Sequence, residues 1–165
     1  MSRFCVSRAC GLGVAVALMA GLSIARAQVP QANPSDVKAL QECLKKVQDV
    51  GAEDCTGSVV ATCLPDADKA SDAQVLQCTL REQAAWDVAL TSTNEQVEAR
   101  TPDAAKAQLT AAATAWAAAR QQTCDFMAAA VGEPGAKSVS AACNQTETAN
   151  RVYLLLGLLP YLAKK

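Results

Sequence analysis

Histidine is absent from this sequence, and aromatic residues are few: two tryptophans, two tyrosines and two phenylalanines among 165 residues. Eight cysteines are present, but no two have the C-x-x-C spacing. The usual ligand sets for zinc and the usual thiol redox motif are therefore missing. No glycine-rich phosphate loop occurs either. We expect a protein that is not an enzyme, with no catalytic residues, no metal and no cofactor.

The first 27 residues have the pattern of a secretory signal peptide. Arg3 and Arg8 precede the apolar run GLGVAVALMAGLSIA, and this run closes on Ala25-Arg26-Ala27. The alternative is a membrane anchor, but the run is shorter than the ~20 residues that span a bilayer. We expect cleavage after Ala27 and a periplasmic or secreted mature chain with no transmembrane span.

The mature chain, residues 28–165, is acidic. Three arginines leave with the signal peptide, so 12 basic and 16 acidic residues remain and the net charge is −4. Nucleic acid requires clustered lysines and arginines, so it is not an expected partner. A cationic protein partner suits this charge.

Cys5 and Cys10 also leave with the signal peptide, and six cysteines remain. An even number in a small exported domain predicts three disulfides. Six cysteines allow 15 pairings, which sequence alone does not resolve. We prefer neighbours along the chain: Cys43–Cys55, Cys63–Cys78 and, as the firmest pair, Cys124–Cys143.

The mature sequence predicts helices throughout, because no segment shows the two-residue alternation of a strand. Ser35 or Asp36 is the expected first cap, and Thr101 caps the fourth helix. Residues 28–34 form a polar lead-in, and residues 35–165 form one domain. The expected fold is all-α, a small disulfide-stabilised bundle of four to five helices. Their approximate ranges are 35–50, 54–63, 71–100 and 101–131, and the last helix starts at Ser138 or Ser140 and ends near Gly157 or Pro160.

The C-terminal segment YLLLGLLPYLAKK is apolar on nearly all sides. A helix of this kind is usually buried among others, and we favour burial here. The alternative is an exposed patch that contacts a partner.

Two segments, AWAAARQQTCDF (115–126) and AACNQTETANRVYLL (141–155), resemble the LprI-type lysozyme-inhibitor family. The upstream segments CTGSVVATC (55–63) and EQAAWD (82–87) are also similar to exported members. The residues that match the family pattern are Trp86, Asp87, Trp116, Arg120, Thr148 and Arg151.

The resemblance implies a helical, disulfide-linked, exported binding protein, some of whose relatives inhibit lysozyme by protein–protein contact. The partner would be a cationic lysozyme. The alternative is an envelope interaction module that binds another envelope protein through its apolar C-terminal helix.

The family motif has a structural interpretation as well. We expect Trp86 and Trp116 to pack in the core. Arg120 would be held by an acid of the neighbouring helix, Glu82 or Asp87, or lie on an indole face. Asp125 and Glu147 are expected to be solvated charges rather than an acid–base pair.

Overall fold

The computed structural model describes residues 31–50 and 54–162, without the side chains of residues 48–50. The predicted signal peptide and residues 28–30 lie outside this part. The described residues contain helices and no strand, which confirms the all-α prediction. The elements are α1 (Pro34–Val50), α2 (Ser58–Cys63), the 3-10 turn η1 (Ala67–Lys69), α3 (Asp72–Arg100), α4 (Asp103–Val131), α5 (Ala136–Leu158) and the 3-10 turn η2 (Leu159–Tyr161).

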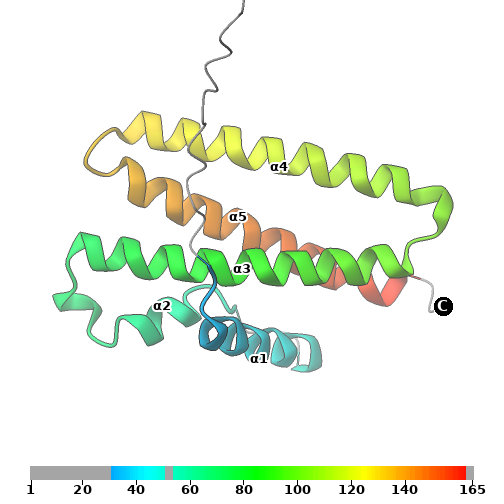
Figure 1. The fold of residues 1–165 in the computed structure, drawn as a ribbon, viewed down its shortest axis with the longest axis horizontal. Helices are drawn as coiled ribbons and strands as arrows, with labels where there is room; N and C mark the ends of the chain where they lie inside the picture. The colour runs from blue at the N-terminus through cyan, green and yellow to red at the C-terminus, as the bar shows by residue number, and fades with distance from the viewer. Residues whose placement is uncertain (1–30, 51–53, 163–165) are drawn as a thin grey trace, which may run out of the picture.

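The two central helices are α3 and α5, which pack along each other (Figure 1). α4 lies against α5 at one edge of the molecule, whereas α1 and α2 pack on α3 at the opposite edge. The bundle is therefore layered in the order α4, α5, α3 and then the α1–α2 pair.

The main hydrophobic core lies between α1, α2, α3 and α5. Trp86 of α3 is its largest side chain and is fully buried, as predicted, and its ring meets Tyr153 of α5 edge-on at 5.5 Å between centroids. The other buried members of this core are Leu40, Leu44, Cys55, Val59, Ala85, Ala89, Ala149 and Val152. A smaller cluster of Val97, Leu155 and Leu159 closes the far end.

α4 is held differently from the other long helices. Its sequence is rich in alanine, the residue with the highest helix propensity, and only Cys124 of its 29 residues is fully buried. Because α4 packs mainly on α5, one narrow stripe of the helix faces the protein. The rest of its surface is open to solvent.

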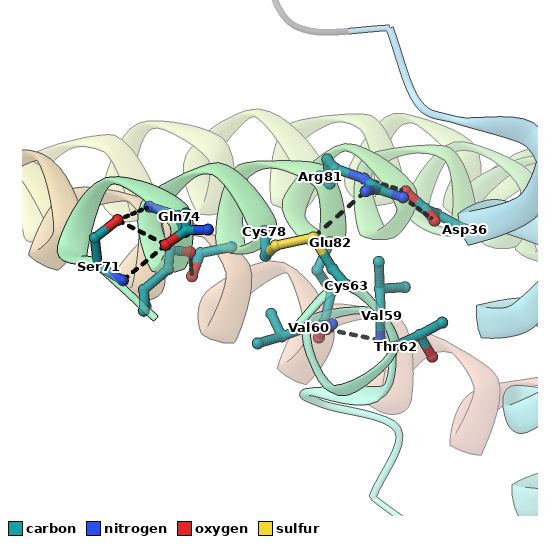
Figure 2. The surroundings of a disulfide bond; sticks show 12 residues. Asp36, Val59, Val60, Thr62, Cys63, Ser71, Gln74, Cys78, Arg81 and Glu82 are labelled. Carbon is teal, nitrogen blue, oxygen red and sulfur yellow. Dashed lines mark hydrogen bonds and ion pairs between the residues drawn. A yellow bond between two sulfur atoms is a disulfide. The ribbon is translucent and has the colours of Figure 1, made fainter. Parts of the chain in front are cut away.

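Glu82 is a fully buried carboxylate at the centre of the α2–α3 contact. In Figure 2 its side chain reaches the first turn of α2, beside Val59 and Val60. The N-terminus of a helix carries free N–H groups and a partial positive charge, both of which favour a carboxylate. Its hydrogen-bond donors are the backbone N–H groups of Gly57 (2.6 Å), Val59 (3.0 Å) and Val60 (2.9 Å), Trp86 Nε1 (3.2 Å) and Gln145 Nε2 (2.6 Å).

The start of α1 differs from the prediction. The helix begins at Pro34, so neither Ser35 nor Asp36 caps it. The capping side chain is that of Asn33, which accepts a hydrogen bond from the backbone N–H of Ser35 (3.0 Å). Asp36 is instead buried and accepts two hydrogen bonds from Arg81 of α3, at 2.9 and 2.8 Å (Figure 2). This two-bond ion pair fixes α1 against α3.

Two further predicted boundaries are also wrong. α2 begins at Ser58 rather than at residue 54, after Gly57, whose φ of +90° is a conformation that favours glycine. The Thr101 hydroxyl donates to the Val97 carbonyl (2.7 Å), so Thr101 closes α3 instead of capping α4, which begins at Asp103.

Three disulfides join neighbouring elements, and they are the three pairs preferred among the 15. Cys43–Cys55 links α1 to the segment before α2, and Cys63–Cys78 links α2 to α3 (Figure 2). Cys124–Cys143 links α4 to α5 across the turn in which Gly132 adopts a φ of +71°. α5 begins at Ala136, before both predicted starts, Ser138 and Ser140.

The predicted full burial of the C-terminal helix is wrong for one of its faces. Val152, Leu155 and Leu159 are buried. Leu154 and Tyr161, by contrast, are 64% and 85% exposed. The reason is that α4 covers only part of α5, which leaves this face of its C-terminal half without a neighbouring helix.

We predict that Glu82→Gln lowers the free energy of unfolding by about 2–4 kcal/mol, because the amide presents donors to buried N–H groups that need an acceptor. Denaturant unfolding with the disulfides intact measures this loss. The control is Glu95→Gln, an exposed acid of the same helix, which should change stability by less than ~0.5 kcal/mol. Equal effects of the two substitutions would contradict the role given to Glu82.

Candidate functional site

Five of the six residues predicted from the family motif lie together where α3, α4 and α5 meet. We call this group the Trp116 cluster, and its members are Asp87, Trp116, Arg120, Thr148 and Arg151. The sixth residue, Trp86, is separate from the cluster and belongs to the core beside Glu82.

Arg120 of α4 is the centre of the cluster. Its Nη1 lies 3.3 Å from Oδ1 of Asp87 on α3 and donates to the Thr148 hydroxyl on α5 at 2.6 Å. One guanidinium therefore connects three helices. Of the two acids considered as its partner, Asp87 is the one that Arg120 contacts, because Glu82 faces α2.

The Thr148 hydroxyl has two roles. It accepts from Arg120 and donates to the backbone carbonyl of Asn144 at 2.7 Å. The side chain is fully buried. Both of its hydrogen bonds are therefore made within the protein, and the position of Arg120 is tied to the backbone of α5.

Trp116 contacts two guanidinium groups and is only partly buried. The Cζ atoms of Arg120 and Arg151 are 5.0 and 5.6 Å from the centre of the indole ring, within the range of cation–π contacts. The prediction that Trp116 packs in the core is wrong. Because α4 is the outer helix, no third helix covers the indole.

Arg151 is the second cation of the cluster. Its contact with the Trp116 ring holds the side chain in place, but no carboxylate of the described residues forms an ion pair with it. It is partly exposed. The cluster thus contains one arginine that is ion-paired within the protein and one without a carboxylate partner among the described residues.

Burial raises the pKa of Asp87 above its ordinary value of 3.8, and the charge and hydrogen bond of Arg120 only partly oppose this effect. Asp87 also lines a shallow pocket of about 510 Å³ beside α3. Asp87 therefore positions Arg120, and burial makes its charged form less favourable than it is in water.

The remaining candidate acids lie apart from the cluster's hydrogen bonds. Asp125 is exposed and accepts a hydrogen bond from Gln121 at 2.8 Å. Glu147 is partly exposed on α5. Within residues 31–50 and 54–162, no group of three or more cysteine, aspartate or glutamate side chains could hold a metal ion, and no helix is long and apolar enough to cross a membrane.

The fold and the cluster define a class: an all-helical domain joined by disulfides, with an arginine–tryptophan cluster between α4 and α5. Residues 63–155 match the family described as lysozyme inhibitor LprI, and the chain belongs to this family. All six motif residues lie within the match, whereas α1 precedes it. No match was found among the curated proteins or among the solved structures.

We predict that wild-type stability rises relative to that of Asp87→Asn as the pH is lowered from 7 towards 3.8. The folded-state pKa of Asp87 is raised, so the cost of burying its charge is present at neutral pH and is lost at low pH. Denaturant unfolding of both proteins across this range measures the difference. A constant difference, or a wild type that loses stability relative to the variant, would show that the ion pair with Arg120 dominates.

Proposed function

We propose that the protein is an exported inhibitor that binds lysozyme through the Trp116 cluster, in the periplasm or outside the cell. Membership of the lysozyme inhibitor family supports the activity. The signal-peptide pattern of residues 1–27 supports export. The observation that carries the choice of surface is Arg151, a partly exposed arginine held on a tryptophan ring.

The chemistry of the target favours this surface. Lysozyme cleaves its substrate with a pair of carboxyl groups in an open cleft. A guanidinium is well suited to carboxylates because it donates two parallel hydrogen bonds. Arg151 would meet these acids, while the acidic remainder of the inhibitor would attract a cationic lysozyme at longer range.

The cluster is also built to bind without rearrangement. Arg120 is held by Asp87 and Thr148, and it supports one side of the Trp116 ring. The ring in turn supports Arg151. Pre-organised side chains lose less conformational entropy on binding, so such a surface gains affinity without additional contacts.

A second candidate function is an envelope module that binds another protein through α5. The exposed Leu154, Leu158 and Tyr161 support it, because they follow Arg151 at spacings that place them on one side of the helix. In the first proposal these residues extend the lysozyme contact. In the second they form the whole contact, and lysozyme is not bound.

A cell-wall turbidity assay with the mature protein tests the proposed function. The protein should slow lysis by at least one of several lysozyme types in proportion to its concentration. If every lysozyme remains fully active at an excess of the protein, inhibition is excluded and the envelope module remains.

We predict that Arg151→Gln and Trp116→Ala each weaken inhibition by at least about tenfold, the cost typical of a central interface residue. The matched controls are Lys137→Gln, an exposed cation of α5, and Phe126→Ala, an aromatic residue of α4 that is 72% exposed. Circular dichroism checks that each variant is folded. Unchanged inhibition by both cluster variants would place the contact elsewhere.

A further inference from the structure

A groove lies between α1, α3 and the C-terminal end of α5, among residues that the Trp116 cluster does not use. Its larger part has a volume of about 610 Å³, within the range of ~300–1,000 Å³ that is usual for small-molecule sites. The lining includes Val47, Gln96, Arg100, Tyr153, Leu156 and Leu159. A smaller part, of about 190 Å³, shares Gln96 and Leu156 and reaches Lys45. We call the two parts together the Arg100 groove.

The groove is cationic although the mature chain is acidic. Arg100 and Lys45 each line one part of it, and the described side chains of its lining include no aspartate or glutamate. Neither cation forms an ion pair with a described side chain. The walls of the larger part are mainly apolar, the smaller part is lined mostly by polar side chains, and Leu156 is common to both parts. An unpaired guanidinium beside apolar walls suits a ligand that has one anionic group and an apolar body.

We propose that the Arg100 groove binds a single-chain anionic amphiphile of the alkyl carboxylate class. The carboxylate would pair with Arg100, and the alkyl chain would lie along the apolar residues of the larger part, Val47, Leu156 and Leu159. This inference is independent of lysozyme inhibition, because neither Trp116 nor Arg151 lines the groove.

Gly157 offers a direct way to close the groove. It lines the larger part, and a Cβ atom added to it would meet no other atom within 4 Å. A larger side chain at this position would occupy the groove rather than displace the core. Because residue 157 is in α5 and has no positive φ, replacing glycine also favours the helix.

Isothermal titration calorimetry of the mature protein with dodecanoate, below its micelle concentration, tests the proposal. We expect binding that is at least about tenfold stronger than that of dodecyltrimethylammonium, which has the same chain and the opposite charge. Decanoate, two methylenes shorter, should bind about tenfold or more weaker than dodecanoate, since each buried methylene contributes about fourfold.

Two variants and one control complete the experiment. Gly157→Leu should abolish dodecanoate binding, and Arg100→Gln should weaken it about tenfold. Lys137→Gln, which removes an exposed cation elsewhere on α5, should leave it unchanged. Circular dichroism verifies folding, and Arg100→Gln keeps the test valid if Gly157→Leu does not fold.

No binding of dodecanoate, equal binding of the cationic amphiphile, or undiminished binding by folded Gly157→Leu and Arg100→Gln would each overturn the proposal. The lysozyme assay is separate from this titration. Failure of the amphiphile site therefore leaves the proposed inhibition untouched, and failure of inhibition leaves the site untouched.

Discussion

The buried carboxylate of Glu82 is the interaction on which the arrangement of the helices depends. A charge removed from water is strongly unfavourable unless polar groups surround it. Here the donors are three backbone N–H groups, of Gly57 and of the first turn of α2, together with the indole of Trp86 and the amide of Gln145. The requirement fixes α2, α3 and α5 relative to one another. Two disulfides, Cys43–Cys55 and Cys63–Cys78, then retain α1 and α2 beside this centre.

The outer helix α4 follows a different physical principle. It is stable as a helix because of its alanines, but it buries too little surface to be held by packing alone. Cys124–Cys143 and the contacts of Arg120 attach it to α5 and α3. The consequence is a division within the molecule. On the Glu82 side the carboxylate is fully buried, whereas the α4 side leaves the indole of Trp116 and the guanidinium of Arg151 only partly buried.

Most of the fold could be predicted from the sequence because helical periodicity and cysteine spacing are local properties. The helices and the family follow from such patterns, whereas the choice between Glu82 and Asp87 as the partner of Arg120 came only from the structure. The role of Glu82 could not be predicted, because its donors are as far away in sequence as Gly57 and Gln145. The exposure of Trp116 was missed for a related reason. Large apolar rings are usually buried, and only the position of α4 at the edge of the bundle shows that the indole is partly exposed.

Amide hydrogen exchange at Val59 and Val60 tests the central role of Glu82 most directly. Both N–H groups donate to its carboxylate, and Val59 is buried. If Glu82 organises the bundle, these amides should open only with global unfolding, so that their exchange free energy equals the unfolding free energy to within ~1 kcal/mol. Exchange as fast as that of the exposed turn Ala67–Lys69 would show that α2 opens independently and would contradict the account.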